Sequence, residues 1–379
     1  MREGWKQKIW DEVLEIRSGR NQKAVENPDG IYPILGSAGN IMGYAEDYIC
    51  DEGTTIIGRK GNINNPMIIQ EKFWNVDTAF GLQVKECLDK KFLYYFCENF
   101  NFLELDKGSG RPSLVKTDLK KIKIPIPPIE EQNQIVQILD EAFAKIDQAI
   151  VNIEQNIQNA EDLFQSKLNQ IFSQKREGWE EKKLGEVSNI MYGCTSKVVD
   201  KGNAQYVRIT DIQKGKINWQ NVPTINISKE ENLKYQLNKG DIVFARTGAT
   251  TGKSYLMENP PNSVFASYLI RVQSEAEILT PSFLYLYFQS GTYWGIVKKG
   301  TSGSAQGGFN ASKLSNMTIH FPKDKNDQLN YVESISQIRK PIEILSIEYQ
   351  KKLQNLEDLK KSLLEKAFSG ELTKSEVEV

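Results

Sequence analysis

The chain alternates between two kinds of hydrophobic pattern. Short stretches such as "DIVFAR", "SYLIRVQ" and "KIKIPIP" place apolar side chains at alternate positions or in brief runs, and Gly, Pro and Asn separate them. This pattern is typical of β-strands joined by turns. Two much longer stretches carry apolar residues at intervals of three and four, which predicts helices. We therefore expect compact α+β domains alternating with long helices.

The first long helix is predicted to begin after Pro127-Pro128 and to continue to Phe172. Neither Gly nor Pro interrupts these 44 residues, and Glu130 and Glu131 in the first turn favour the helix dipole. Its predicted apolar face comprises Leu139, Ala142, Ile146, Ile150, Ile153, Ile157, Ala160, Phe164 and Leu168. A helix of this length measures about 65 Å, which is too long for one face of a small domain.

The second long helix is predicted near the C-terminus. Its apolar face comprises Ile335, Ile338, Ile342, Leu345, Tyr349, Leu356, Leu359 and Leu363. Pro341 interrupts the pattern and is expected to kink the helix or to mark its start. A spacing near 3.5 suits a coiled coil, and the economical partner for the first helix is the second one, packed antiparallel. Unpaired helices, or a coiled coil with another protein, are the alternatives.

The second half of the chain repeats the first. "REGW" occurs at residues 2–5 and again at 176–179, and aligning "IYPILGSAGN" with "QYVRITDI" sets Tyr32 opposite Tyr206. "TIIGRKGNI" matches "IVFARTGAT", which sets Arg59 opposite Arg246. Further matches are "FLYYF" with "FLYLY", "GSGRPSLVKTDLKKIKIPIP" with "GSAQGGFNASKLSNMTIHFP", and "NAEDLFQSKLNQIFS" with "NLEDLKKSLLEKAFS". One module is therefore written twice.

These observations predict an α+β fold of two similar globular domains, separated by two long antiparallel helices that form a coiled coil with a pseudo-twofold internal repeat. The expected segments are a first domain at 1–128, a central helix at 129–173, a second domain at 174–325, a C-terminal helix at 326–373 and a tail at 374–379.

Charge is unevenly distributed although the whole chain carries a net charge of only −1. Residues 174–325 hold 20 Lys and Arg against 13 Asp and Glu, a net of +7, whereas residues 129–173 hold 2 against 8, a net of −6. Basic charge is thus concentrated where a polyanion could bind, and the acidic helix fits protein docking better than DNA contact. A solvated surface with incidental asymmetry is the alternative.

Several classes of protein are disfavoured. No apolar run is long enough to span a membrane, and the charged N-terminus does not resemble a signal peptide, so we expect a cytoplasmic protein that does not bind membranes. Four cysteines without CxxC spacing and one histidine predict buried reduced thiols and no metal site.

Two stretches imitate catalytic motifs. "GATTGKS" at 248–254 is one residue too short for a phosphate-binding loop, and "NPPN" at 259–262 lacks the aromatic residue of the amino-methyltransferase element, so it should be a turn. We predict neither a catalytic site nor a cofactor bound by this chain.

Polar, glycine-flanked basic loops recur at equivalent places in the two domains and are the candidate DNA contacts. In the first domain they supply Arg59, Lys60, Asn62, Asn64, Lys107, Ser109 and Arg111. In the second they supply Arg246, Thr247, Thr250, Thr251, Lys253, Lys298, Lys299, Ser304 and Gln306. Arg can bind guanine bidentately, Asn and Gln can bind adenine, and Thr, Lys and backbone N–H groups hold phosphates. The alternative is that these are surface turns, with Arg59 and Arg246 holding a carboxylate inside the fold.

Together these features resemble the DNA-specificity (S) subunits of type I restriction-modification systems. The resemblance rests on "YPILGSAGN", "YVRITDI", the stretch "IPIPPIEEQNQI" that leads into the first long helix, and the terminal "LEKAFSGEL", and it covers essentially the whole chain. The stretch that leads into the second long helix, "FPKDKNDQLNYV", departs from the family pattern.

The resemblance implies that each domain is a target recognition domain for one half of a split double-stranded DNA site. It further implies that the helices set the spacing and dock two adenine-N6 methyltransferase (M) subunits. S-adenosylmethionine would bind to those subunits, and motor-nuclease (R) subunits would complete the complex. The chain itself would catalyse nothing. A stand-alone DNA-modifying enzyme, or a coiled-coil scaffold that does not bind DNA, are the competing hypotheses.

Overall fold

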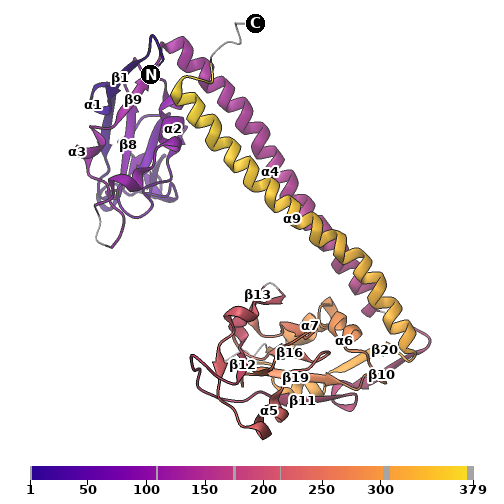
Figure 1. The fold of residues 1–379 in the computed structure, drawn as a ribbon. Helices are drawn as coiled ribbons and strands as arrows, with labels where there is room; N and C mark the ends of the chain where they lie inside the picture. Colours follow the sequence, from indigo (N-terminus) through magenta and orange to yellow (C-terminus); the bar gives the residue numbers. More distant parts are fainter. Residues whose placement is uncertain (1, 108–109, 174–175, 214, 302–307, 374–379) are drawn as a thin grey trace. The chain divides into compact units, whose positions relative to one another are not determined.

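The computed structural model describes residues 2–107, 110–173, 176–213, 215–301 and 308–373. The chain forms two compact units, one comprising Met1–Glu154 with Tyr349–Val379 and the other Gln155–Glu348. Each unit contains an α+β head together with part of helix α4 (Ile129–Phe172) and part of helix α9 (Lys325–Ser369) (Figure 1). We call residues 1–128 the first head and residues 174–325 the second head.

Each head is built on a four-stranded antiparallel sheet with the same strand order. In the first head the order is β2 (Leu14–Ser18), β8 (Ala79–Val84), β5 (Thr54–Gly58), β6 (Met67–Ile69). In the second it is β11 (Ser188–Tyr192), β19 (Leu269–Ser274), β16 (Ile242–Ala245), β17 (Ser254–Leu256). The two central strands are the most buried part of each sheet.

A smaller three-stranded sheet also recurs in both heads, and in each copy its middle strand pairs with one neighbour in parallel. In the first head the order is β4 (Ile41–Ala45), β3 (Tyr32–Leu35), β7 (Trp74–Asn75). In the second it is β15 (Thr224–Ile225), β12 (Ala204–Val207), β18 (Ser263–Phe265). The repeat that the sequence predicts is therefore confirmed strand by strand.

The remaining elements are short. The paired strands are β1 (Lys6–Ile9) with β9 (Lys123–Ile126), β10 (Trp179–Lys183) with β20 (Thr318–Pro322), and β13 (Ile212–Gln213) with β14 (Lys216–Ile217). The helices are α1 (Trp10–Val13), α2 (Lys90–Asn99), α3 (Lys116–Leu119), α5 (Lys229–Tyr235), α6 (Pro281–Tyr287), α7 (Gly291–Thr301) and α8 (Ala311–Ser315). Among the described residues no helix combines the length and apolar character needed to cross a bilayer.

One sequence alignment was wrong by two residues. Tyr32 pairs with Ala45 in β4, and its structural counterpart Ala204 pairs with Ile225 in β15. Tyr206 therefore lies two positions further along its strand than Tyr32. Shared residue type suggested the match, whereas strand pairing fixes the register, because a slip of two preserves the same face of a strand.

The repeated phrase "REGW" joins each head to the long helices. In the first unit Arg2 Nη1 donates to Glu131 Oε1 at 2.6 Å and to Thr373, while Trp5 Nε1 donates to Glu131 Oε2 at 3.0 Å. Glu131 lies in the first turn of α4 and Thr373 follows the end of α9. The start of the chain is thus bonded to the start of one helix and the end of the other.

In the second unit the same phrase contacts the opposite helix ends. Arg176 Nη1 donates to Tyr331 Oη in α9 at 2.9 Å, and its Nη2 donates to the Gln170 carbonyl in α4 at 3.0 Å. The Trp179 ring packs edge-on against Tyr331 and Phe283. Both copies therefore use an arginine and a tryptophan to fix a head to the start of one long helix and the end of the other.

A buried glutamine fixes the start of each long helix. Gln132 is fully buried, accepts from the Asp89 N–H at 2.8 Å, and donates to the carbonyls of Cys87 and Pro127 at 3.1 and 2.9 Å. Gln328 is likewise buried and bonds in the same way to three backbone groups of its own head, Thr280 N–H and the carbonyls of Ile278 and Pro322. The starts of α4 and α9 are therefore equivalent, although their sequences differ.

The long helices pack antiparallel within each unit. In the first unit Lys360 of α9 bonds to Asp147 and lies over the Phe143 ring of α4, whereas Glu131 lies beside the end of α9. In the second unit Arg339 of α9 bonds to Glu161 at 3.0 Å and lies over Phe164. Within each unit α4 and α9 lie side by side (Figure 1). The predicted apolar face of α4 is buried or half-buried throughout.

Two details of the predicted interior were wrong, the burial of Leu359 and that of Cys87, and one of the two alternatives for Pro341 is excluded. Leu359 is 46% exposed, and the buried or half-buried stripe runs instead through Leu356, Lys360 and Leu364, because the α-helical repeat of about 3.6 residues drifts from a strict heptad. Pro341 does not start α9, which begins at Lys325 and contains the proline in its interior. Buried neighbours such as Ile342 hold the helix there. All four cysteines are free, but Cys87 is exposed, because it lies in a turn.

Candidate nucleic-acid interface

The second head places most of its predicted contacts around the loop that follows β16. Gly248 and Gly252 both have positive φ, at +74° and +93°, which lets the chain turn back tightly between β16 and β17. Thr251 Oγ1 donates to the Gly248 carbonyl at 2.7 Å, and Lys253 N donates to the Thr250 carbonyl at 2.9 Å. The strand β17 follows, so "GATTGKS" lacks the helix that a phosphate-binding loop requires.

Helix α7 packs against this loop. A side-chain carbon at Gly252 would lie 2.8 Å from the Trp294 ring and 2.9 Å from Val297, so only glycine fits. Tyr293 Oη donates to the Gly252 carbonyl at 2.5 Å, and burial raises the pKa of this phenol, so it stays a donor. The fold thereby brings the loop at 247–253 to the helix whose last turn carries Lys298 and Lys299, both exposed.

Arg246 directly follows β16 at the start of this loop. Its backbone N–H donates to the Tyr268 carbonyl at 3.3 Å, and its carbonyl accepts from Phe309 N at 2.9 Å. The guanidinium carbon lies 4.9 Å from the centre of the Tyr192 ring, which is a cation–π geometry. Among the described residues its side chain forms no ion pair, so the alternative of a buried carboxylate partner is not what the structure contains.

Arg59 holds the same backbone position in the first head. Its N–H donates to the Thr78 carbonyl at 2.7 Å, and its carbonyl accepts from Leu114 N at 2.9 Å. Its guanidinium lies 5.7 Å from the Phe80 ring centre, and Nη1 donates to the Asp77 carbonyl at 3.3 Å. Within the described part of the chain it too forms no ion pair with a carboxylate.

The residues after Arg59 divide into exposed and structural groups. Lys60 is exposed and forms a backbone bridge with Ser113. Asn62 is exposed. Asn64 Oδ1 instead accepts from Phe102 N at 2.7 Å, so this side chain already holds the turn that follows α2. We conclude that Asn64 has a structural role in addition to any contact with a ligand.

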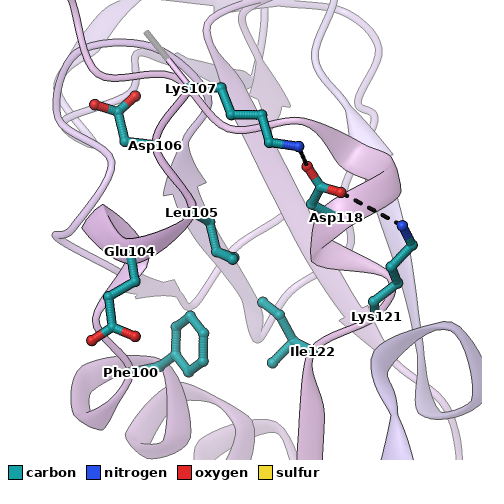
Figure 2. Close-up of a pocket in the computed structure, with 8 residues that line it drawn as sticks. All are labelled: Phe100, Glu104, Leu105, Asp106, Lys107, Asp118, Lys121 and Ile122. Atoms are coloured by element: carbon teal, nitrogen blue, oxygen red, sulfur yellow. Dashed lines mark hydrogen bonds and ion pairs between the residues drawn. The ribbon is translucent and has the colours of Figure 1, made fainter.

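Lys107 lies at the rim of a cavity of about 370 Å³ (Figure 2). The cavity is lined by Phe100, Glu104, Leu105, Asp106, Lys107, Asp118, Lys121 and Ile122. Lys107 Nζ lies 2.5 Å from Asp118 Oδ2, and Lys121 Nζ lies 3.7 Å from Oδ1 of the same carboxylate. The hydrogen bond from Lys107 lowers the pKa of Asp118, so the carboxylate stays charged and holds both lysines over the cavity.

Arg111 is exposed. Ser109, Ser304 and Gln306 lie outside the described residues. Thr247 and Thr250 are half-exposed at the loop of the second head, beside the exposed Lys253. The structure thus sets Lys60 beside Ser113 in the first head and the loop at 247–253 against α7 in the second, whereas Lys107 is directed to Asp118.

Aromatic residues at this surface were missed by the sequence analysis. Tyr192, Tyr268 and Trp294 are 39%, 60% and 39% exposed, and all three lie next to the loop or to Arg246. Exposed aromatic rings beside basic residues are typical of binding surfaces. They were missed because each lies on a different element, and only the tertiary structure brings them together.

The "NPPN" stretch is a connection between β17 and β18, as predicted. Asn262 Nδ2 donates to the Asn203 carbonyl at 2.7 Å, and its Oδ1 accepts from Asn232 at 3.2 Å. The stretch therefore ties the segment just before β12 to helix α5. No group of three or more His, Cys, Asp or Glu side chains among the described residues is placed to hold a metal ion.

The fold matches solved structures over almost the full chain. A chain from a study of complex assembly and conformational transition of the type I R-M system superimposes with a TM-score of 0.80 at 19% identity, covering 98% of this chain and 99% of that one. The HsdS subunit from Thermoanaerobacter tengcongensis gives a TM-score of 0.56 at 18% identity, with 98% of each chain covered. At these identities the likeness establishes the fold.

The sequence decides the family. The model of the type I restriction modification DNA specificity domain matches residues 2–159 and again residues 176–355. The chain belongs to this family. A putative type I restriction enzyme specificity subunit of Haemophilus influenzae is 29% identical over 310 residues, which cover 77% of both chains. The EcoBI specificity subunit of Escherichia coli is 23% identical over 351 residues, covering 84% of this chain and 73% of the relative.

Membership makes this chain a specificity subunit of the type I restriction-modification class, as the resemblance predicted. The two matches fall on the two copies of the module, so the internal repeat corresponds to two specificity domains.

Proposed function

We propose that each head reads one half of a bipartite double-stranded DNA site. The observation that carries this proposal is the repeated arginine loop. Arg59 and Arg246 have the same backbone partners in the two heads, while the side chains around them differ. Equivalent scaffolds with different contact residues are what two readers of different half-sites require. The net charge of +7 over residues 174–325 supports contact with a polyanion.

The proposal assigns no catalysis to this chain. Methyl transfer to adenine N6, and the binding of S-adenosylmethionine, would belong to two methyltransferase subunits docked on the long helices, and motor-nuclease subunits would complete the complex. The acidic charge of the α4 segment supports protein docking, since residues 129–173 have a net charge of −6 and would repel phosphates. Helices α4 and α9 would fix the spacing between the half-sites.

Binding and methyl-transfer assays test this function. The full chain, co-expressed with the methyltransferase subunits, should select one bipartite sequence from a random duplex library, with affinity falling steeply as salt rises. The chain alone should transfer no labelled methyl group from S-adenosylmethionine to DNA. Methyl transfer by the chain alone would make it an enzyme, and binding without any sequence preference would reject the reading role.

A further inference from the structure

The two equivalent arginines are supported by rings on different strands. In the first head Arg59 lies over Phe80 of β8, the strand next to β5. In the second head Arg246 lies over Tyr192 of β11, which is two strands away from β16. The difference is confined to side chains, because the backbone bonds of both arginines are the same.

Sheet register explains the difference. In the first head Ser18, Phe80 and Ile57 form one row across β2, β8 and β5. The equivalent row in the second head is Tyr192, Ile270 and Phe244 across β11, β19 and β16. In the first head the ring under the arginine, Phe80, is the middle residue of its row. In the second head the ring under the arginine, Tyr192, is the outer residue of its row. The two guanidinium groups are therefore supported by rings that belong to different strands of equivalent sheets.

The two arginines also differ in how many of their side-chain donors are already hydrogen-bonded. Arg59 Nη1 donates to the Asp77 carbonyl, so part of its donor set is already used. Among the described residues Arg246 Nε is buried without a partner, and neither Nη atom of Arg246 forms a hydrogen bond. The stacked guanidinium of the second head therefore keeps both terminal nitrogens available to a ligand.

Tyr192 is itself fixed in place. The Ala311 N–H, at the start of α8, donates to the Tyr192 hydroxyl at 3.0 Å. The ring is thus attached to the sheet through its backbone and to α8 through its hydroxyl. A planar ring held at both ends limits the positions that the long Arg246 side chain can adopt.

We infer that Tyr192 is a positioning residue for sequence recognition by the second head. Its ring supports the Arg246 guanidinium, whose terminal nitrogens form no hydrogen bond among the described residues, whereas Arg59 lies over Phe80 and donates to the Asp77 carbonyl. This inference rests on the proposed function, and it names which residue directs the guanidinium to its base. Ser18, the counterpart of Tyr192, has no such role, because Phe80 supports Arg59.

The test measures base discrimination with the full chain co-expressed with the methyltransferase subunits. Selection from a random duplex library first gives the wild-type site, and binding to singly substituted duplexes then gives a discrimination ratio at every position. Tyr192→Ser, which copies the first head, should lower the ratio at one position of one half-site about tenfold. Tyr192→Phe keeps the ring but loses the bond to Ala311, so the ratio should fall less than in Tyr192→Ser. Ser18→Ala is the matched control and should change neither half-site.

A double substitution separates positioning from general stability. Arg246→Ala should abolish discrimination at the same position, and Tyr192→Ser combined with Arg246→Ala should be no worse than Arg246→Ala alone, because the two residues act as one unit. If thermal melting shows that Tyr192→Ser is unfolded, Tyr192→Leu is used in its place. Leucine fills the space with an apolar side chain but has no π face for the guanidinium, so the same loss of discrimination is expected.

Three outcomes would each overturn the inference. Tyr192→Ser could lose affinity equally for every sequence, it could keep its discrimination unchanged, or its effect could multiply with that of Arg246→Ala. Those outcomes leave the wild-type site intact and so differ from failure of the proposed function, in which the wild-type chain selects no sequence.

Discussion

At the scale of single residues, the two heads combine a shared backbone with different side-chain neighbours. Arg59 and Arg246 follow equivalent buried strands and form the same pair of backbone bonds, but each guanidinium stacks on a ring from another strand. Asp118 similarly sets the direction of Lys107 and Lys121. Contacts between neighbouring side chains, rather than the backbone, therefore decide what each loop presents to a ligand.

Replacing either arginine should affect one half-site only. Arg246→Ala is expected to weaken binding by about 1–3 kcal/mol when the second half-site is intact, and Arg59→Ala should do the same for the first, because each would lose a bidentate base contact. Arg246→Lys keeps the charge but cannot bind bidentately, so it should lose discrimination and retain non-specific affinity. Fluorescence polarisation with half-site variants checks this. A lowered unfolding midpoint with uniform loss of binding would instead assign Arg246 a structural role.

Removing the Asp118 charge should release Lys107 and Lys121. Asp118→Asn is expected to raise affinity for DNA of any sequence and to steepen the salt dependence, by about 0.9 in logarithmic slope for each phosphate newly contacted. Asp29→Asn makes the same charge change at an exposed loop of the same head and should leave the slope unchanged. The measurement is a salt titration of binding. Equal slopes for Asp118→Asn and the wild type would mean that neither lysine meets the DNA.

At the scale of secondary-structure elements, specific polar contacts hold the heads to the helices. Gln132 and Gln328 each satisfy three backbone groups inside a buried joint. Between the helices, the aromatic member of each cation–π pair lies on α4 and the cation on α9, in both units. This complementary arrangement favours pairing of α4 with α9 over pairing of either helix with a copy of itself.

Removing the hydrogen bonds of Gln132 should lower the stability of the first unit. Gln132→Leu keeps similar volume but leaves the Asp89 N–H and two carbonyls without partners, which should lower the free energy of unfolding by about 3 kcal/mol. Gln137→Leu changes an exposed glutamine further along α4 and should change stability by less than about 0.5 kcal/mol. Denaturant unfolding followed by circular dichroism measures both. A loss below about 1 kcal/mol for Gln132→Leu would show that water or local rearrangement replaces the joint.

At the scale of the whole molecule, the proposed function makes the two long helices the measure of half-site spacing. Adding seven residues to α4 after Gln155, together with seven to α9 after Glu348, should preserve the apolar stripe and lengthen the pair by about 10 Å. That corresponds to roughly three base pairs at about 3.4 Å each.

We expect the longer chain to recognise the same bases in both halves with a longer gap between them. Overall affinity should fall, because three base pairs also turn the second half-site by about 100° around a duplex of roughly 10.5 base pairs per turn. Mapping methylated adenines in host DNA measures the gap directly. Seven residues inserted after Asn259, in an exposed loop, should leave the gap unchanged. An unchanged gap in the helix variant would show that the helices do not set the spacing.

Local patterns in the sequence were enough to predict the α+β heads, the repeat, the bounds of α4 and the family. Hydrophobic periodicity and internal similarity can be recognised in the sequence alone. Sequence similarity also set Arg59 opposite Arg246 correctly, since each directly follows a buried strand in the same sheet position. The features that needed the folded structure depend instead on which strands become neighbours.

Strand pairing set the Tyr32 register and placed Tyr192 rather than an equivalent of Phe80 under Arg246, and an ion pair with Asp118 of α3 directed Lys107. The partners of these residues are distant along the chain, or their side chains turn in a direction that no local pattern encodes. Packing between distant elements selects one neighbour from several, and that choice fixes the chemistry each head presents.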